Sequence, residues 1–392
     1  MDTQVAIVGA GPAGLVLSHL LHLDGISSVV VEARSRNYVE NRLRAGVLEH
    51  ATVDLLRKVG LGARMDSEGL LHEGVKFRFS DRTHRIDFRR LTDRAVMIYP
   101  QQDIVKDVIA QRLKVGGHIL FDAEVVGVEL DMDKPSLHFI KNGERHRIDC
   151  EFLAACDGAH GPCRNFVPAG TLQILERCYA FSWLGVLAEA KPVSSELIYA
   201  GHDRGFALAS MRSPEISRLY LQVSADEDIG LWPDHRIWDE LHRRFSSSDS
   251  TPLNEGPIIQ KNIAALRSVV TMPMQYRRMF LAGDAAHIVP PTGAKGLNLA
   301  VFDALMLARA LSSYFSAKDE TALSNYSNAC APRIWKVQYF SWWMTSMFHR
   351  LGPDKFDRNR QLAELSLLVH SEAGAKFLAE NYVGLPFEDF FV

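Results

Sequence analysis

The chain has 392 residues, more than one hydrophobic core usually holds, so we expect two domains or one large domain with an insertion. It carries 44 Lys and Arg against 47 Asp and Glu, and the resulting net charge of −3 argues against nucleic-acid partners. The five cysteines are scattered without a CxxC pair, which favours free thiols in a reducing cytoplasm and no metal site. No run of the sequence reaches the roughly 20 apolar residues that cross a bilayer, so we expect no membrane segment.

The first 32 residues predict a βαβ unit. Residues 4–8 form a short apolar run that ends at Gly9, as a buried parallel strand does. Leucines at helical spacing follow between Leu15 and Leu23, and a second β-branched strand is expected over 28–32. Such a unit usually begins a parallel sheet that helices cover.

The middle of the chain predicts antiparallel strands of two kinds. A β-meander is expected from the alternating segments 119–121, 125–130 and 137–140 and from Asn142-Gly143, a hairpin signal before a strand near Ile148. A separate buried strand over 152–156 should end at Asp157-Gly158. Between 177 and 266, short strands and an amphipathic helix over 237–245 predict a second, antiparallel domain. A strand over 279–282 then leads to Gly283-Asp284, and helical spacing continues from Leu297 to the end.

Gly9, Gly11 and Gly14 form a GxGxxG motif between the first strand and its helix. The first glycine permits a tight turn, the second lets the backbone approach a pyrophosphate, and the third allows close packing of helix and strand. Glu32 ends the next strand at the distance expected for a carboxylate that binds a ribose hydroxyl. The motif therefore predicts a bound dinucleotide and leaves NAD and FAD open.

Two later motifs narrow the choice. Asp157 lies in the string CDGAHGPCR after a predicted strand, and Asp284 lies in GDAAH before a proline- and glycine-rich segment. Together with GxGxxG they resemble the three fingerprints of the class A flavoprotein aromatic hydroxylases. The segments 196–208, 283–300, 333–336, 341–346 and 380–386 are similar to the 4-hydroxybenzoate 3-hydroxylase members of that family, and the similarity runs from residue 5 to residue 387.

The resemblance implies an α/β (α+β overall) fold: a Rossmann-like FAD-binding domain with a β-meander, an inserted antiparallel-sheet substrate domain and a helical C-terminal region. The FAD-binding domain would comprise 1–75, 99–176 and 268–315, the substrate domain 76–98 and 177–267, and the helical region 316–392. It also implies tightly bound, non-covalent FAD. The FAD-contacting positions would be Gly9, Gly11, Gly14, Glu32, Arg42, Arg44, Gln101, Asp157, Arg218, Asp284, Gly296, Leu297 and Asn298, with Lys295 as an electrostatic contributor.

The implied substrate is a small aromatic acid. Ser210, Arg212 and Tyr220 match the binders of its carboxylate, and a guanidinium suits a carboxylate because it gives two charge-assisted bonds. Tyr199 and Tyr382 match the pair that takes the phenolic proton, with His72 at the solvent end of this relay and the carbonyl of Pro291 near the substrate hydroxyl. The implied reaction hydroxylates 4-hydroxybenzoate at C3 to 3,4-dihydroxybenzoate with NAD(P)H and O2, through a flavin C4a-hydroperoxide.

The electron donor has no second GxGxxG, as in that family. Tyr38, Arg42, Arg44, His160 and Arg267 match its contacts, although Ala33-Arg34 and Ala159 depart from the common pattern. The arginines around Tyr38 (Arg34, Arg36, Arg42 and Arg44) favour the 2′-phosphate of NADPH, with NADH still possible. The resemblance further implies a cytoplasmic homodimer.

Two alternatives stay open from the sequence. A related acid such as 3-hydroxybenzoate or 4-aminobenzoate could be the substrate, although Ser210, Arg212, Tyr199 and Tyr382 together favour a para-phenol. A flavin-binding protein that has lost turnover is the other alternative, and the presence of all the proton-relay residues argues against it.

Overall fold

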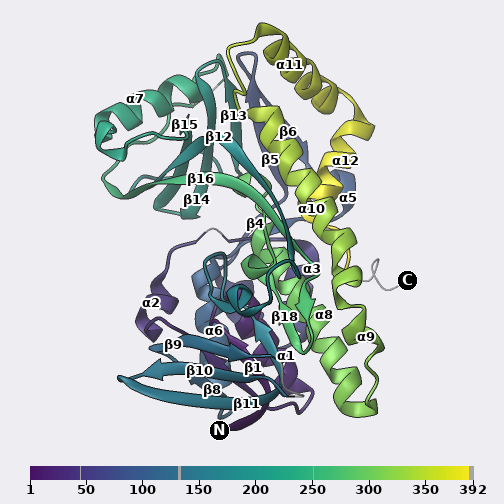
Figure 1. The fold of residues 1–392 in the computed structure, drawn as a ribbon. Helices are drawn as coiled ribbons and strands as arrows, with labels where there is room; N and C mark the ends of the chain where they lie inside the picture. The colour runs from purple at the N-terminus through teal and green to yellow at the C-terminus, as the bar shows by residue number, and fades with distance from the viewer. Residues whose placement is uncertain (45, 131–133, 250, 388–392) are drawn as a thin grey trace.

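The computed structural model describes residues 1–44, 46–130, 134–249 and 251–387. Two lobes, each built on a large sheet, lie one above the other, and long C-terminal helices run beside both (Figure 1). The predicted α/β fold with an antiparallel insertion and a helical end is confirmed.

The lower lobe holds the nucleotide sheet. Its main strands, in order across the sheet, are β17 (Gln275–Tyr276), β18 (Met279–Leu281), β11 (Glu144–Ala155), β1 (Asp2–Val8), β2 (Ser28–Val31) and β8 (His118–Leu120). β1 pairs in parallel with β2 and β11, and β11 pairs in parallel with β18. The apolar run predicted over 4–8 therefore forms the centre of a sheet that is covered on both faces, where both faces must be apolar.

Helices cover this sheet. The first helix, α1 (Pro12–Leu23), packs against α8 (Gly296–Ala317) on one side and near α6 (Gln101–Lys114). Among the described helices of 18 residues or more, α8 alone is apolar enough to span a membrane, but 67% of its most apolar window is buried inside the protein. This burial is typical of a core helix.

Two strand predictions in this lobe are wrong. The predicted meander strand over 119–121 is β8, which pairs in parallel with β2 in the main sheet. The strands expected near Ile148 and over 152–156 are one continuous strand, β11. Its first half pairs with β10 (Ser136–Lys141), which in turn pairs with β9 (Ala123–Glu129), and its second half pairs with β1. Local alternation could not reveal this double use, because pairing partners are set by tertiary packing.

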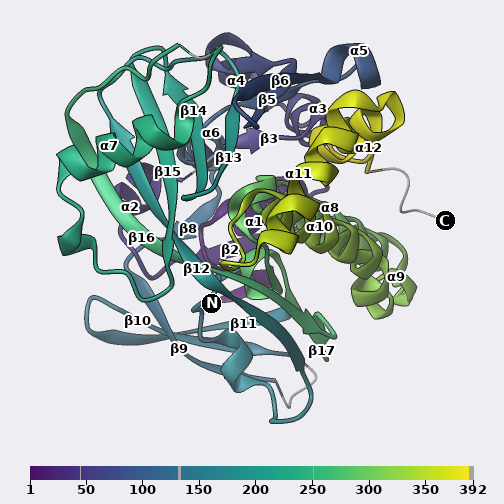
Figure 2. The same ribbon diagram turned by 90° about the horizontal axis from the view of Figure 1, so that it is seen from above.

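The upper lobe holds the substrate sheet. Its strands, in order, are β19 (His287–Ile288), β16 (Ile258–Met272), β12 (Gln173–Ala188), β15 (Ile216–Ser224), β14 (Gly205–Ser213), β13 (Ile198–His202), β5 (Gly74–Phe79) and β6 (Arg82–Asp87). β12 and β16 pair along most of their length and extend down toward the nucleotide sheet (Figure 1). α7 (Asp234–Phe245) lies on one side of this sheet, and α10 (Tyr326–Phe348) lies on the other (Figure 2).

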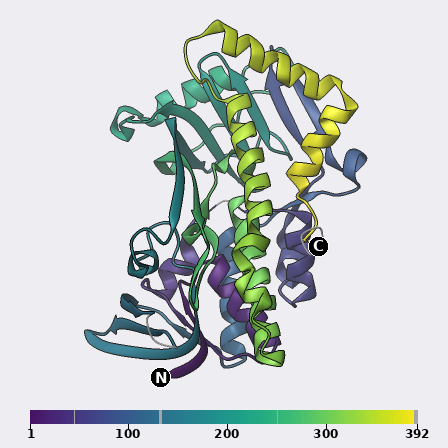
Figure 3. The ribbon, with the colours of Figure 1, turned by 45° about the vertical axis from the view of Figure 1, so that its right-hand side comes forward.

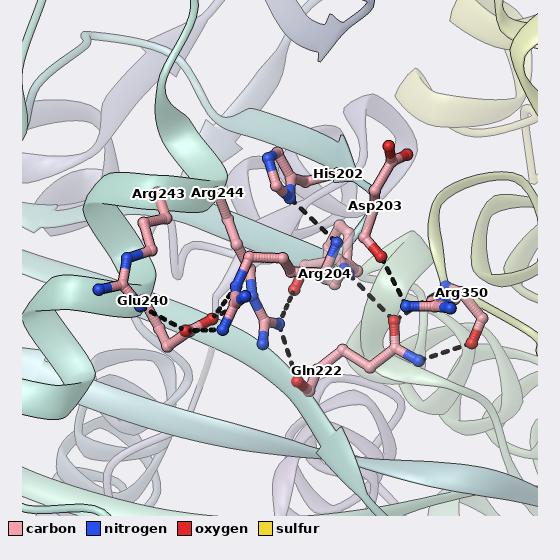
Figure 4. Close-up of polar contacts among 9 residues, drawn as sticks. His202, Asp203, Arg204, Gln222, Glu240, Arg243, Arg244 and Arg350 are labelled. Carbon is pink, nitrogen blue, oxygen red and sulfur yellow. Dashed lines mark hydrogen bonds and ion pairs between the residues drawn. The ribbon is translucent and has the colours of Figure 1, made fainter. Parts of the chain in front are cut away.

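A buried carboxylate joins α7 to the strands. Glu240 of α7 accepts hydrogen bonds from Arg204, in the turn between β13 and β14, and from Arg244 at 3.3 Å (Figure 4). Gln222 of β15 binds both the main-chain N–H and the carbonyl of Arg350, at 2.9 and 2.8 Å. These contacts hold the β13–β14 turn and β15 between α7 and the end of α10.

Smaller elements complete the structure. A three-stranded sheet of β3 (Val47–Leu48), β7 (Val96–Ile98) and β4 (Leu70–His72) lies between the lobes. The short helices are α2 (Arg36–Asn41), α3 (His50–Lys58), α4 (Ala63–Glu68), α5 (Phe88–Thr92) and α9 (Thr321–Ser324). The chain ends with α11 (Lys355–His370) and α12 (Glu372–Val383), and α10 runs upright along both lobes (Figure 3). β7, expected within the substrate domain, instead pairs with β3 and β4, and the full division into domains stays a prediction.

Candidate active site

The glycine-rich loop is built by close backbone contacts. Gly9 has φ +102°, and a Cβ there would lie 2.4 Å from the carbonyl oxygen of Cys156. A Cβ on Gly14 would lie 2.1 Å from the carbonyl oxygen of Gly9. Glu32 accepts the main-chain N–H of Ala10 at 2.7 Å, so its carboxylate lies directly beside the loop. The turn at Gly9 and the helix contact at Gly14 thus need glycine for reasons within the protein.

Gly11 and Asp157 fit an FAD molecule. A Cβ on Gly11 would meet no atom of the described residues within 4 Å, so this glycine leaves open space in front of the helix N-terminus. The pyrophosphate of a dinucleotide binds in such a space. Asp157 accepts the N–H of Cys163 at 2.9 Å through Oδ2, and its Oδ1 is buried without a hydrogen-bond partner among the described residues. Burial raises the pKa of this carboxyl, and a hydroxyl of the cofactor would satisfy the free oxygen.

The start of α8 carries three residues expected at FAD. Gly296 and Leu297 are partly exposed at the helix N-terminus, and the segment with the exposed Asp284 precedes them. Asn298 is buried, and its side chain accepts the N–H of Glu49 at 2.8 Å and donates to the carbonyl of Val47 at 2.9 Å. In this structure the Asn298 side chain therefore anchors β3 to α8, and any contact with FAD stays a prediction.

A buried charge cluster lies behind this helix start. Glu49 binds Lys295 and Arg333, both at 2.8 Å, and the three side chains are almost fully buried. Lys295 also donates to the carbonyl of Tyr382 at 2.9 Å, and burial lowers the pKa of its ammonium. Sequence reasoning gave no role to Glu49 or Arg333, because a single charge in an apolar segment carries no signal of its partner.

The strand register gathers the predicted substrate residues on one face. Leu208 of β14 lies between Tyr199 of β13 and Tyr220 of β15. Ser210 follows Leu208 by two residues, so it points to the same face, where α10 lies. The alternate positions of these strands are apolar and pack under α7; they are Ile198, Ala207, Ala209, Leu219 and Leu221.

Arg212 lies where the pairing of β14 with β15 shifts register. One terminal nitrogen donates to the carbonyl of Arg44 at 2.8 Å. The other, Nη2, is buried and has no hydrogen-bond partner among the described residues. Burial and the nearby Arg218 lower the pKa of this guanidinium. A buried donor of this kind is well suited to an anionic oxygen, because a carboxylate supplies both the charge and the missing acceptor.

Ser210 and Tyr220 flank Arg218. Ser210 donates to the carbonyl of Arg218 at 3.2 Å, and the Arg218 side chain donates to the Tyr220 hydroxyl at 2.5 Å. The structure therefore brings Ser210 and Tyr220 together around Arg218.

Tyr199 and Tyr382 form a buried hydroxyl chain. The Tyr199 hydroxyl donates to the carbonyl of Thr292 at 2.9 Å and lies 2.9 Å from the hydroxyl of Tyr382. Because a phenol has one proton, Tyr382 must be the donor between the two rings. Burial raises the pKa of both hydroxyls, so both are neutral at physiological pH. Pro291, whose carbonyl was expected near the substrate, directly precedes Thr292 and is exposed.

His72, expected at the solvent end of the relay, is buried in this structure, and its part in the relay stays a prediction. It is 1% exposed, and its Nε2 lies 3.1 Å from the sulfur of Met211. Burial lowers its pKa to about 4, so the ring is neutral at physiological pH. His72 is the last residue of β4, which lies between the lobes. Its burial depends on tertiary packing, which the periodicity of the sequence does not reveal.

Comparisons with known proteins agree with this geometry. A family model described as an FAD binding domain matches residues 2–341. The chain is 45% identical over 390 residues to p-hydroxybenzoate hydroxylase of Acinetobacter baylyi, covering 99% of this chain and 96% of that protein. The chain belongs to the FAD-dependent aromatic hydroxylases. The predicted family, enzyme class and FAD cofactor are therefore confirmed.

Similarity extends to more distant proteins. A 3-(3-hydroxy-phenyl)propionate/3-hydroxycinnamic acid hydroxylase of Escherichia coli is 25% identical over 82% of this chain and 58% of that protein. The crystal structure of a p-nitrophenol 4-monooxygenase from Pseudomonas putida has a TM-score of 0.82, with 18% identity, covering 96% of this chain and 97% of that one.

The residues expected at the nicotinamide donor lie on the hydroxylase surface. Tyr38 is half-exposed between two arginines: the guanidinium carbons of Arg34 and Arg42 lie 5.6 and 5.9 Å from its ring centre. His160 is exposed, and Arg267 lies 3.6 Å from Glu176. Arg267 also lines a cavity of about 290 Å³ between β12, β16 and the segment that follows Asp157. Gln101 begins α6 and is partly exposed.

Proposed function

We propose that this hydroxylase converts 4-hydroxybenzoate to 3,4-dihydroxybenzoate, using NADPH as the donor and O2 as co-substrate. Two features of the substrate-sheet face carry the proposal: Nη2 of Arg212 has no hydrogen-bond partner among the described residues, and Tyr199 forms a hydroxyl chain with Tyr382. A carboxylate would satisfy the first, and a para-hydroxyl group would use the second. The 45% identity to p-hydroxybenzoate hydroxylase supports the same substrate.

In this proposal Arg212 holds the carboxylate, and the hydroxyls of Ser210 and Tyr220 complete its shell. FAD, when bound, would supply the redox chemistry that links the donor to oxygen. Gly11 and Asp157 would hold the cofactor, together with Asp284. The sheet would fix the position of the acid relative to FAD. This position determines which ring carbon is attacked.

The tyrosine pair would carry the phenolic proton. The Tyr199 hydroxyl would accept the proton of the substrate phenol and turn its own proton from the Thr292 carbonyl toward the Tyr382 oxygen. Because burial raises the pKa of both tyrosines, neither holds a negative charge. As Tyr382 accepts the proton of Tyr199, it would release its own proton to water, and the substrate would gain phenolate character. An electron-rich ring is the better nucleophile toward activated oxygen.

The experiment is oxidation of NAD(P)H across a panel of benzoates, with each product identified. 4-Hydroxybenzoate should give 3,4-dihydroxybenzoate with one donor consumed per product. A higher kcat/KM for 3-hydroxybenzoate or 4-aminobenzoate would overturn the substrate assignment. Donor oxidation that no aromatic acid stimulates would instead indicate a flavin protein without turnover.

Substitution of the two tyrosines tests the relay itself. Tyr199→Phe and Tyr382→Phe should bind 4-hydroxybenzoate nearly as well as the parent, but less product should form per NADPH and hydrogen peroxide should accumulate. The reason is that an undissociated phenol reacts slowly. Stopped-flow kinetics and peroxide assays measure this split, and tight coupling in both variants would contradict the relay.

We further propose a cytoplasmic homodimer. The five cysteines are free in the structure, as expected in a reducing compartment. Helix α10 exposes an apolar stripe of Trp335, Tyr339 and Trp342, which are 47%, 49% and 37% exposed. Phe377 of α12 contacts Trp343 of α10, and the neighbouring α12 residues Lys376 and Glu380 carry opposite charges that a second copy of the same face could pair. Light scattering of the parent and of Trp335→Lys/Trp342→Lys tests the dimer, with Leu231→Lys on the far side of the substrate sheet as control.

A further inference from the structure

A buried carboxylate on α8 contacts both ends of the segment that carries Asp284. Oδ2 of Asp303 accepts the main-chain N–H of Gly283 at 2.8 Å and lies 2.6 Å from Nε2 of His287. The side chains of Asp303 and His287 are 0% and 1% exposed. One oxygen atom therefore fixes the first and the last residue of the segment 283–287.

The two partners are an acid and a base joined by a short hydrogen bond. Burial alone would lower the pKa of His287, but the charge and the hydrogen bond of Asp303 outweigh it and raise the pKa. Oδ1 of Asp303 is buried without a hydrogen-bond partner among the described residues. A buried pair of titratable groups in which one oxygen lacks a partner contributes little net stability, even when the pair is ionised. Its presence calls for another role.

The segment between the two contacts has little freedom. Gly283 has φ +65°, and a Cβ there would lie 3.1 Å from Ala13 of α1 and 3.3 Å from Ala300 of α8. Ala286 donates to the carbonyl of Gly283 at 2.8 Å, and its own carbonyl accepts the N–H of Thr271 at 2.8 Å. The turn is thus wedged between two helices and attached to β16, and it presents the exposed Asp284 at its centre.

We propose that Asp303 and His287 are positioning residues that hold this turn in the form that binds FAD. The inference rests on the proposed contact of Asp284 with the cofactor. The pair acts through Gly283 and the main chain, so loss of either partner should let the turn shift and move Asp284 away from its position. Rigid supporting contacts of this kind determine how precisely a binding group is aimed.

Reconstitution of the apoprotein with FAD tests the proposal without any aromatic substrate. The variants are Asp303→Asn, which keeps an acceptor for Gly283 but removes the charge, and His287→Gln, which keeps a neutral donor. Each should raise the FAD dissociation constant at least about tenfold, and the double variant should be no worse than the weaker-binding single variant, because both act through one turn. Ser18→Ala is the control, since Ser18 is a buried polar residue of α1 in the same lobe.

A structural role alone would give a different pattern. The apoprotein variants would then melt at a lower temperature, but their FAD dissociation constants would equal that of Ser18→Ala. This outcome would overturn the proposal. If Asp303→Asn does not fold, His287→Gln decides alone. Asp284→Asn tests the contact of Asp284 with FAD separately from the positioning role. Unchanged FAD affinity in Asp284→Asn would refute that contact. Weaker FAD binding in Asp284→Asn, with unchanged binding in the Asp303 and His287 variants, would refute only the positioning role.

Discussion

The two lobes prepare their ligand sites in different ways. Around the nucleotide sheet, the close contacts are made by main chain, such as that of Gly9 and Gly14, and the decisive property of a residue is the absence of a side chain. At the substrate sheet, the proposed site is made of side chains, namely Arg212 of β14, Tyr199 of β13 and Tyr382 of α12, which packs beside the sheet. FAD binding should therefore be sensitive to the path of the backbone, and substrate binding to side-chain chemistry.

The largest effect is expected from glycine substitution. Gly14→Ala places a Cβ 2.1 Å from the Gly9 carbonyl oxygen, a contact that only backbone movement can relieve. The protein should be isolated without flavin, or should not accumulate as a folded species. Flavin absorbance per protein and thermal melting measure this.

Gly11→Ala is the matched control, since its Cβ meets no described protein atom within 4 Å. This variant should fold normally, with an unchanged melting temperature of the apoprotein. Its FAD dissociation constant should nevertheless rise at least about tenfold, or about 1.4 kcal/mol, because the methyl group enters the space for the pyrophosphate. If Gly11→Ala and Gly14→Ala had the same effects on folding and on FAD binding, the distinction between a glycine required for protein packing and a glycine required for ligand space would be refuted.

Arg212→Ala should act on the substrate alone. Truncating one member of a buried charge pair costs about 2–5 kcal/mol. The dissociation constant for 4-hydroxybenzoate should therefore rise about 30-fold to a few thousand-fold. The flavin content should stay that of the parent. Titration of flavin absorbance with substrate measures both quantities, and Arg243→Ala, an exposed arginine of α7, should change neither.

Acid should weaken the substrate lobe through its buried histidines. His349 is fully buried, accepts the indole N–H of Trp183 at 2.6 Å through Nε2 and donates to the carbonyl of Thr345 at 2.9 Å. Burial lowers its pKa to about 3, from 6.5 for a free histidine. Between these values the unfolded chain binds the proton that the folded chain refuses, so stability falls as the pH falls below about 6.5.

At pH 5 this one group should cost about 2 kcal/mol relative to neutral pH, at 1.36 kcal/mol per pKa unit. His349→Gln, which can keep both hydrogen bonds without titrating, should show a shallower fall in the free energy of unfolding between pH 7 and pH 5. Urea denaturation at the two pH values measures this. His287 contrasts with it, because its pKa is raised and its contribution is present in acid and lost as the pH rises. Equal slopes for parent and His349→Gln would contradict the assignment.

The smallest effect is expected at the coenzyme surface, where the charges are exposed and screened. NADPH should be preferred over NADH, and the preference should weaken in salt. Arg42→Ala should reduce the ratio of kcat/KM values for the two donors, since Arg42 lies over Tyr38. Arg36→Ala should change it less, because Arg36 is paired with Glu40 at 2.7 Å. An equal or higher kcat/KM of the parent for NADH would refute the preference.

The same contrast explains what the sequence could predict. The GxGxxG turn and Glu32 follow each other within one βαβ unit, so their spacing alone predicts a site, and the structure places Glu32 beside the loop. The substrate residues come from strands and helices far apart in the chain, and only the family resemblance connected Tyr199 with Tyr382. Their contact at 2.9 Å depends on α12 packing beside the sheet.

Other features had no signal in the sequence. Glu49, Arg333 and Lys295 are isolated charges in sequence and one cluster in space. His72 was expected near solvent and is buried, because the depth of a residue depends on the elements that pack over it. The continuous strand β11 was read as two strands, since its meander half and its sheet half have different burial patterns.

The order of the strands also affects how the chain is made. β11 ends at Ala155, whereas its parallel neighbour β18 begins at Met279, after the whole inserted sheet, and α8, which packs on α1, follows later still. At a synthesis rate of ~5–20 residues per second, the segment between Ala155 and Met279 takes roughly 6 to 25 s to emerge. During that interval one edge of β11 and the apolar side of α1 have no partner. The chain is therefore most prone to aggregate during this interval, and the rate of translation determines how long the interval lasts.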